Sequence, residues 1–299
     1  MKIAVLLFGH LRDFEQCADS LNENLLSRYD SDVFMHTWDE MDHTSKSWHE
    51  SNRVSINKVD KSLIRKIETK YHPKGLEIEH QEKYSKERII QSPYFEHFQL
   101  SSAIPYFIFY SLNKANRMRL EYEKKNGISY DYVFVTRPDI RLKTPFELEK
   151  YLWQIEVLGF NMDSCRFFAT YDSKYFSLGY TVTNSSNDLF FFAKPKVIDK
   201  YIEVNRYLTD DEIEKYMING VSIYTAKEIH CGLMPIPLTY MMDADWDYSG
   251  VRKSQPHKQR KRWKKVVYGI GSGLLSPIAW LFKRYRLFNY YEYKSTFGA

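Results

Sequence analysis

The stretch Tyr130–Leu142, YDYVFVTRPDIRL, decides the fold that this sequence predicts. It places four β-prone apolar residues in a row, Tyr132–Val135, shortly before Arg137-Pro138-Asp139. A run of this kind predicts a buried strand, and Pro138 fixes φ and ends it. Arginine and aspartate are seldom buried without partners. The stretch therefore predicts a buried strand that ends on charged side chains with a specific structural or functional role.

Two other apolar runs end in the same way. Ile3–Phe8 leads into Gly9-His10-Leu11-Arg12, and the short run Val33–His36 leads into Thr37-Trp38-Asp39. Strands and helices alternate along the chain, which predicts an α/β fold with a mostly parallel sheet flanked by helices. In such a sheet, ligands bind beyond the carboxyl ends of the strands. We therefore expect the three polar tips to meet at one edge.

The remaining pattern is coarser. The sequence predicts strands over 3–8, 33–36, 130–140, 189–193 and 233–238, short strands or loops over 165–183, and helices over 14–26, 60–70, 85–91, 102–126, 145–153, 196–207, 210–219 and 222–231. No low-complexity linker divides this part, so residues 1–250 are predicted to form one domain and residues 251–299 a separate tail.

Composition limits the class of protein. Hydrophobic residues make up 43% of 299 residues, which is enough for a large core. The three cysteines, Cys17, Cys165 and Cys231, form no metal or disulfide motif, which favours a reducing compartment. The six apolar residues Ile3–Phe8 are too few for a signal peptide, so the domain is expected in the cytoplasm.

Charge is unevenly distributed. Residues 251–299 hold twelve Lys or Arg and one acid, a net charge of +11, whereas the other residues hold 31 basic and 37 acidic side chains, a net charge of −6. A mildly acidic domain argues against nucleic-acid binding by that domain. The basic tail is predicted to have a role of its own.

The tip after the third predicted strand has the residues of a phosphate or metal site. Asp139 is a candidate ligand for Mg²⁺ or Mn²⁺, which favour oxygen ligands and often share them with phosphates. Arg137 can bind a phosphate through two parallel hydrogen bonds. The structural alternative is a salt bridge that caps the strand.

The other tips suggest contacts to a nucleotide. Gly9 permits a sharp turn close to a ligand, and His10 and Arg12 suit a phosphate or a ribose. Trp38 could stack on a base while Asp39 accepts a hydrogen bond from the ribose or the base. The alternatives are an ordinary strand-to-helix loop and a core tryptophan beside a solvated aspartate.

Other acidic and histidine clusters are weaker candidates. Asp30-Ser31-Asp32 precedes its strand, so a turn at the opposite edge is the better interpretation. Asp243, Asp245 and Asp247 could add a metal ligand or touch a second substrate. His36, His43 and His49 have no zinc-like spacing.

The order of these motifs resembles bacterial glycosyltransferases that build surface polysaccharide and have a GT-A-like sheet for nucleotide sugars. The resemblance spans roughly residues 3–238 and is carried by GHLRDFE, DVFMHTWDE, SLNKANRMRLEYEKKNG, YDYVFVTRPDIRL, SSNDLFFFAKPKVIDKY and AKEIHCGLM. It implies a hexosyltransferase-like enzyme that moves a sugar from a nucleoside-diphosphate donor to a glycan or polyprenyl-linked acceptor, as in O-antigen, capsule or lipopolysaccharide synthesis.

In that family an Asp-x-Asp motif stands where this chain has Arg137-Pro138-Asp139. An arginine therefore replaces one acid, and metal dependence is open, since Arg137 could do part of the cation's work. Asp188 is the candidate base or acceptor-positioning acid, and Glu228 and His230 are further candidates near the same cleft. The alternatives are a turn at Asn187-Asp188, a helix-surface glutamate and a satisfied histidine.

The tail has the pattern of a membrane-surface element. HKQRKRWKK at 257–265 and KRYR at 283–286 flank the seventeen-residue apolar segment Val266–Phe282. Basic residues at both ends favour an interfacial element on the cytoplasmic membrane. A true membrane span and a tail packed on the domain are the alternatives.

The sequence leaves two other functions open. One is a non-catalytic, membrane-associated scaffold or binding protein of the same pathway. The other is a sugar kinase, although the sequence contains neither G-x-x-x-x-G-K-[ST] nor a glycine-rich kinase loop.

Overall fold

The structure is a computed structural model. It describes residues 1–42, 58–81, 104–170, 189–203, 223–242 and 244–248, together with residues 89, 91, 92, 95, 209 and 211. In chain order the elements are β1 (Lys2–Phe8), α1 (Phe14–Asn24), η1 (Leu26–Arg28), β2 (Asp30–Trp38), α2 (Lys61–Tyr71), β3 (Gly75–Glu79), α4 (Ile104–Asn126), β4 (Tyr132–Thr136), β5 (Ile140–Leu142), α5 (Leu148–Val157), β6 (Cys165–Thr170), β7 (Phe190–Ala193), α7 (Pro195–Glu203), α9 (Ile223–His230), β8 (Met234–Met241) and β9 (Trp246–Tyr248). Most of the two predicted helices at 85–91 and 210–219 lies outside the described residues, as do Asp188, Asp243 and the tail.

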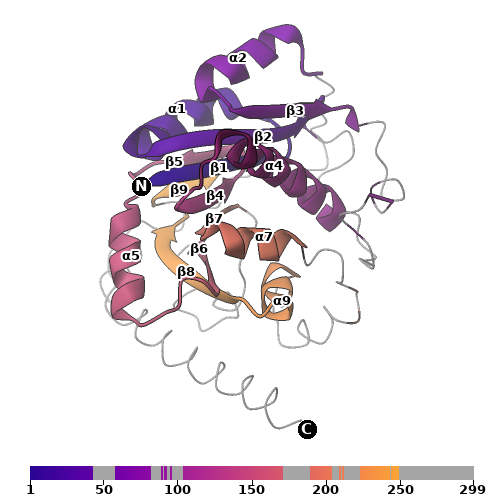
Figure 1. Cartoon of the computed structure of the whole chain (residues 1–299). Coiled ribbons are helices and arrows are strands. Elements are labelled where there is room, and N and C mark those ends of the chain that lie inside the picture. The colour runs from indigo at the N-terminus through magenta and orange to yellow at the C-terminus, as the bar shows by residue number, and fades with distance from the viewer. Residues whose placement is uncertain are drawn as a thin grey trace, which may run out of the picture.

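Seven of these strands form one sheet, in the order β3-β2-β1-β4-β7-β6-β8 (Figure 1). Neighbouring strands are parallel except at β4–β7 and β7–β6, so β7 alone runs against the other six. The prediction of an α/β fold with a mostly parallel sheet flanked by helices is confirmed. The carboxyl ends of β1, β2, β3 and β4 therefore lie at the same edge, called here the carboxyl edge.

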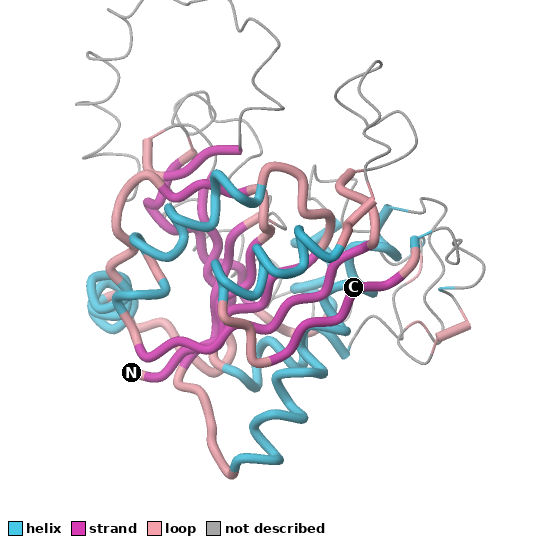
Figure 2. The backbone as a smooth tube through the Cα atoms, turned by 90° about the horizontal axis from the view of Figure 1, so that it is seen from above, coloured by secondary structure: helices cyan, strands magenta, loops and turns pink. Residues whose placement is uncertain are grey.

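Both faces of the sheet are buried. Alternate residues of β1 enter two separate hydrophobic cores, with Ile3, Val5 and Leu7 in one and Ala4, Leu6 and Phe8 in the other. Residues of α1, α2 and α5 complete the first core, and residues of α4, α7 and α9 complete the second. A strand buried on two faces needs a continuous apolar run, which explains the sequence of β1. Figure 2 shows helices on both sides of the strands.

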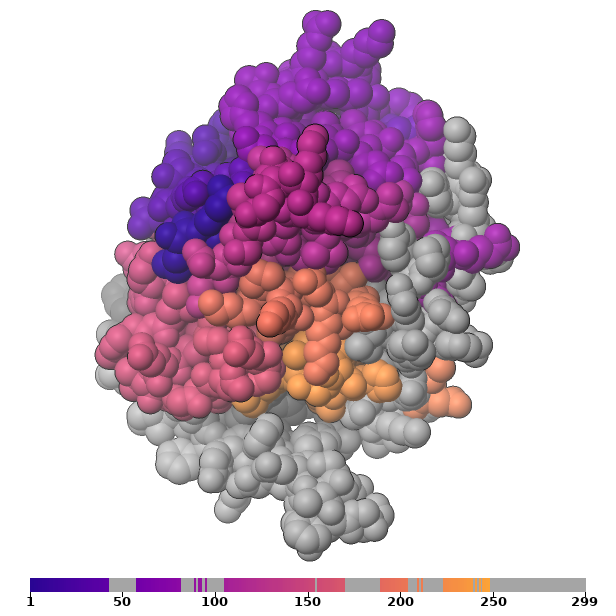
Figure 3. Space-filling view, viewed as in Figure 1, coloured from indigo at the N-terminus to yellow at the C-terminus, as the bar shows by residue number. Residues whose placement is uncertain are grey.

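The order of the strands separates the two halves of the chain. β3, β2 and β1 form one end of the sheet, and β6 and β8 form the other. Figure 3 shows the same division, with residues of the first third of the chain at the top and those after 189 below. A second sheet of two strands joins β5 to β9, antiparallel, directly after the tip of β4.

The structure corrects several predicted boundaries. β2 begins at Asp30 and ends at Trp38, so Thr37 and Trp38 lie within the strand rather than after it. The predicted turn at Asp30–Asp32 is therefore wrong, although the segment does lie at the amino end of β2. Its Asp32 carboxylate accepts a hydrogen bond from the Tyr130 hydroxyl at 2.8 Å. β3 was not predicted at all.

No helix within the described residues is long and apolar enough to cross a membrane. The predicted interfacial segment Val266–Phe282 falls in the tail, outside those residues.

Candidate anion-binding site at the carboxyl edge

The tips of β1 and β4 meet through three charged side chains. Arg12 Nη1 donates to Asp139 Oδ2 at 2.7 Å across 127 residues of sequence. Arg137 donates to the same carboxylate twice, from Nε to Oδ1 at 2.9 Å and from Nη2 to Oδ2 at 2.5 Å. Asp139 is 1% exposed. The predicted convergence of these two tips is therefore observed, with Asp139 at its centre.

The loop after β1 is held in an unusual backbone conformation. Gly9 has φ +91° and Arg12 has φ +45°, so two of four consecutive residues lie in the left-handed region. For a residue with a side chain, such a conformation costs about 1–3 kcal/mol and persists only where the surroundings fix it. The Arg12 amide donates to Met41 O at 2.8 Å, and Arg12 Nε donates to Asp42 Oδ1 at 2.9 Å. The strained loop thus directs the Arg12 guanidinium at Asp139.

The donor set does not fit a divalent cation at Asp139. Both of its carboxylate oxygens accept hydrogen bonds from guanidinium groups, whose positive charge would repel a metal ion. Among the described residues, no group of three or more His, Cys, Asp and Glu side chains is placed to hold a metal. Arg12 and Arg137 balance the charges of Asp139 and Asp42, and guanidinium groups held in this way are also able to bind an anion such as a diphosphate.

The tips of β2 and β3 form a second polar cluster at the same edge. Asp39 accepts from the Gln81 amide at 2.9 Å, from His80 Nδ1 at 2.7 Å and from Lys58 Nζ at 3.4 Å. Burial by itself would raise the pKa of Asp39, but these donors hold it below its usual value. His10 reaches the cluster through its Nε2, 2.5 Å from Gln81 Oε1. The predicted contacts of His10 and Asp39 to a nucleotide stay predictions, and both residues lie at the expected edge.

One buried carboxylate oxygen beside this cluster accepts no hydrogen bond from the described residues. Glu40 is 1% exposed, and its Oε1 accepts from Lys58 Nζ at 3.0 Å. Its Oε2 is buried and has no hydrogen-bond partner among the described residues. A buried carboxylate oxygen without a donor costs free energy, so a water or a ligand hydroxyl at this point would be stabilised.

The stacking role predicted for Trp38 does not agree with its position. Trp38 is 1% exposed, and its ring stacks on Tyr110 with centroids 5.9 Å apart. The rings of His36 and Phe107 approach it edge-on, at 5.1 and 5.8 Å. No face remains for a base, so Trp38 is a core residue. The prediction failed because β2 is longer than its apolar run suggested.

The catalytic roles predicted for Glu228 and His230 also conflict with the topology. α9 leads into the beginning of β8, and Met234 of β8 pairs with Cys165 at the beginning of β6. Both strands run in the same direction as β1, so this end of α9 lies at the amino edge of the sheet. Glu228 is fully buried there and forms an ion pair with Arg166. Neither residue therefore lies at the carboxyl edge.

Two further predictions have different outcomes. Asp188 lies outside the described residues, so its predicted role stays a prediction. Asp247 is 1% exposed and pairs with Arg141 at 2.9 Å and Lys143 at 2.8 Å in the β5–β9 sheet. Asp245 accepts from Thr144 at 2.9 Å. These acids stabilise the small sheet.

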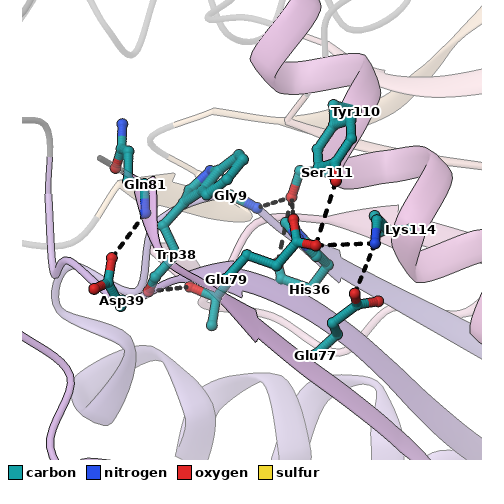
Figure 4. Close-up of polar contacts among 11 residues, drawn as sticks. Gly9, His36, Trp38, Asp39, Glu77, Glu79, Gln81, Tyr110, Ser111 and Lys114 are labelled. Atoms are coloured by element: carbon teal, nitrogen blue, oxygen red, sulfur yellow. Dashed lines mark hydrogen bonds and ion pairs between the residues drawn. The ribbon is translucent and has the colours of Figure 1, made fainter. Parts of the chain in front are cut away.

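A buried network beside the Gly9 loop was missed in the sequence. It joins His36 of β2, Glu79 of β3 and Ser111 and Lys114 of α4 (Figure 4). The signal that could have found it is the alternation of GLEIE at Gly75–Glu79, which is typical of a short strand. Ser111 gave no local signal, because a serine within a long helix is common.

No protein-family model and no curated protein matches the chain. Among solved structures, the chain is similar to mouse xyloside xylosyltransferase 1 in its apo form, with 10% identity and a TM-score of 0.36, over 79% of this chain and 85% of that one. It is also similar to an active-site mutant of LgtC, with 12% identity and a TM-score of 0.37, over 81% of this chain and 75% of that one. At these scores the functional argument rests on the residues of the site.

Proposed function

We propose that this protein is a glycosyltransferase that moves a sugar from a nucleoside-diphosphate donor to a glycan or polyprenyl-linked acceptor in bacterial surface-polysaccharide synthesis. One observation carries the proposal. Arg12 and Arg137 converge on the buried Asp139 at the carboxyl edge, where an open α/β sheet binds its ligands. The motif order across residues 3–238, described above, gives the sugar-transfer class.

The charges suit a departing diphosphate. When the bond between the sugar C1 and the diphosphate oxygen breaks, its electron pair remains on the diphosphate. Guanidinium groups that are already oriented can stabilise this developing charge without reorganising. Asp139 holds Arg137 through two hydrogen bonds and Arg12 through one, so the orientation is fixed before the donor binds.

The acceptor completes the reaction. Its hydroxyl oxygen forms the new bond to C1, and its proton passes to a base. Asp188 remains our candidate for that base, because it directly precedes Leu189 in the sequence. The Leu189 carbonyl accepts from Thr136 Oγ1 at 2.7 Å, at the carboxyl end of β4. Because the described donors around Asp139 are cationic, we propose that the diphosphate is neutralised by arginine rather than by Mg²⁺ or Mn²⁺.

The first test is a thermal-shift screen with UDP, GDP, CDP, ADP, their sugar derivatives and inorganic pyrophosphate, each in EDTA and in Mn²⁺. A ligand at one hundred times its Kd stabilises by about 2.7 kcal/mol, which raises Tm by roughly 4–5 °C in a chain of this size. The rise is expected to be equal in EDTA. A rise that requires Mn²⁺ would overturn the metal-free hypothesis, and no rise with any compound would overturn the donor site.

Sugar transfer separates this proposal from its rivals. A binding protein would bind the donor that gives the largest shift without consuming it, and a sugar kinase would transfer phosphate from ATP. Incubation of that nucleotide sugar with a lipid-linked or short soluble glycan acceptor should release the nucleoside diphosphate in step with glycan extension.

The tail is proposed to hold the enzyme on the inner face of the cytoplasmic membrane. The support is the net charge of +11 around the apolar segment Val266–Phe282. Each basic residue near an anionic surface contributes about 1 kcal/mol, and salt screens that contribution. Burial of apolar side chains adds a contribution that salt does not remove. The full chain should therefore sediment with anionic liposomes, less at high salt but not to zero.

Truncation after Gly250 is the matched comparison. The shortened protein should stay in the supernatant, retain transfer to a soluble acceptor and lose most transfer to a lipid-linked one. A full-length protein that stays in the supernatant with anionic liposomes at low salt would refute the membrane role, and a tail packed on the domain would then be the better account.

A further inference from the structure

A continuous chain of buried hydrogen bonds ends on the loop that carries Arg12. The Gly9 amide donates to Ser111 Oγ at 2.9 Å, and Ser111 Oγ lies 2.7 Å from His36 Nδ1. On its other side, His36 Nε2 lies 3.2 Å from Glu79 Oε2 (Figure 4). Ser111 and His36 are fully buried. Three elements, β2, β3 and α4, thus contribute to a single contact with the loop after β1.

The donors and acceptors fix the direction of this chain. Glu79 is an ionised acceptor, because its Oε1 receives Lys114 Nζ at 2.9 Å and the Tyr110 hydroxyl at 3.3 Å. His36 therefore carries its hydrogen on Nε2, and its Nδ1 is left as an acceptor. The Ser111 hydroxyl donates to Nδ1, with the His36 carbonyl as a second and longer acceptor at 3.3 Å, and the Ser111 oxygen accepts from Gly9. These roles agree with a neutral His36.

The surrounding charges agree with a neutral histidine. The described charged groups around His36 are Glu79 and Glu77 of β3 and Lys114 of α4, and Lys114 bridges the two acids at 2.9 and 2.7 Å. Burial lowers the pKa of His36 despite the raising effect of Glu79. Burial alone would raise the pKa of Glu79, but His36 and Lys114 lower it.

We propose that Ser111 and His36 are positioning residues, which hold the Gly9 amide so that the loop after β1 presents Arg12 to the diphosphate of the donor. The inference rests on the proposed function for its link to catalysis. Arg12 is in a strained left-handed conformation and Gly9 is the most flexible residue type, so the loop keeps its shape only if both ends are anchored. Met41 O anchors the Arg12 amide, and Ser111 anchors the Gly9 amide.

The sharpest test uses two replacements of one residue. Asparagine places an oxygen near the position of Nδ1, so His36→Asn can still accept from Ser111. Glutamine reaches the position of Nε2, so His36→Gln keeps the contact to Glu79 and loses the side-chain contact to Ser111, whose hydroxyl then has only the longer contact to the carbonyl of residue 36. The proposed chain of hydrogen bonds predicts that His36→Asn has the higher kcat/KM of the two. A role in packing alone predicts the higher kcat/KM for His36→Gln, because glutamine is larger.

The expected effects are about tenfold, the size of one lost hydrogen bond. Ser111→Ala and His36→Gln should lower kcat/KM for the donor about tenfold, with His36→Asn within about threefold of wild type. Ser31→Ala is the matched control, since its hydroxyl bonds Leu26 O at 2.8 Å at the other end of β2. A kcat/KM unchanged in Ser111→Ala, or His36→Gln more active than His36→Asn, would overturn the positioning role.

Hydrogen exchange of the Gly9 amide tests the Gly9–Ser111 hydrogen bond without any substrate. Labelling the full chain with ¹⁵N-glycine and carbonyl-¹³C phenylalanine selects the two Phe-Gly pairs, Phe8-Gly9 and Phe297-Gly298. The Gly9 amide should exchange about tenfold faster in Ser111→Ala and His36→Gln than in wild type. Unchanged exchange would refute the anchor. The variants could exchange faster while the wild-type protein neither binds pyrophosphate nor transfers sugar. The hydrogen bond from Gly9 to Ser111 would then be supported, but the proposed function and the link of this bond to catalysis would be refuted.

Discussion

Replacement of Arg137 with alanine is expected to lower kcat for sugar transfer by about 10²–10³, equivalent to about 3–4 kcal/mol of lost transition-state stabilisation. The guanidinium is held on Asp139 by two hydrogen bonds, so it meets the developing charge of the diphosphate in a fixed orientation. The fold should survive, because Arg12 still pairs with Asp139. Steady-state kinetics with the donor found by thermal shift, together with circular dichroism, measure both effects.

The same stretch supplies the control for Arg137→Ala. Arg141 lies four residues further on, is 40% exposed at its side chain and pairs with Asp247 in the β5–β9 sheet. Arg141→Ala should change kcat less than about threefold. Arg137→Lys should fall between wild type and Arg137→Ala, because an ammonium keeps the charge but not the two parallel hydrogen bonds. Full activity in Arg137→Ala would refute the donor site.

Asp139→Ala is a less informative variant than the sequence suggested. The sequence predicts loss of transfer with the fold intact. In the structure Asp139 is 1% exposed and pairs with two arginines, of which Arg12 also pairs with Asp42, so its removal takes a shared carboxylate away from two guanidinium groups at a buried point. We expect a loss of stability as well as of activity, and the arginine variants therefore separate the two effects better.

Glu228→Ala is expected to destabilise the protein by about 3–5 kcal/mol, enough to unfold a substantial fraction of it. Glu228 and Arg166 are both fully buried and ion-paired, so removal of the acid takes away the carboxylate that faces a guanidinium in the core. Aromatic faces of Phe191 and Tyr201 lie 4.0 and 4.9 Å from that guanidinium and offset only part of the cost. Chemical denaturation of wild type and variant measures the difference.

Two comparisons distinguish this structural role from the catalytic one. The double variant Arg166→Met with Glu228→Leu should recover most of the lost stability, because it removes both charges and retains apolar volume. Glu121→Ala, which breaks an exposed ion pair with Arg117, should have little effect. If Glu228→Ala keeps wild-type stability and loses sugar transfer, Glu228 is a catalytic residue after all and the assignment to the core is wrong.

The central strand and its tip were predictable because their signals are local. Tyr132–Thr136 is fully buried, as its apolar run requires, and Asp139 follows at the carboxyl edge. Gly9 was expected to make a sharp turn, and it adopts φ +91°. Each of these features depends on residues within a few positions of one another.

Other features depended on partners that the sequence does not reveal. Trp38 lay beside a charged tip in the sequence, yet Tyr110 and Phe107 of α4 enclose it. Glu228 seemed to be a helix-surface or cleft acid, yet it faces Arg166 of β6 in the core. β3 is a five-residue strand that is only partly buried, so its hydrophobic signal was too weak to identify it.

The sequence by itself determined that this protein alternates strands and helices, buries β1 and β4, and ends both strands on basic residues. Those properties follow from hydrophobic period and turn chemistry, which act between near neighbours. Only the tertiary structure decided that Asp139 receives both arginines and that His36 reaches Ser111, contacts that span 127 and 75 residues. Such contacts are set by strand order and helix packing, because the sheet brings the ends of β1 and β4 to the same edge and α4 places Ser111 beside His36 of β2.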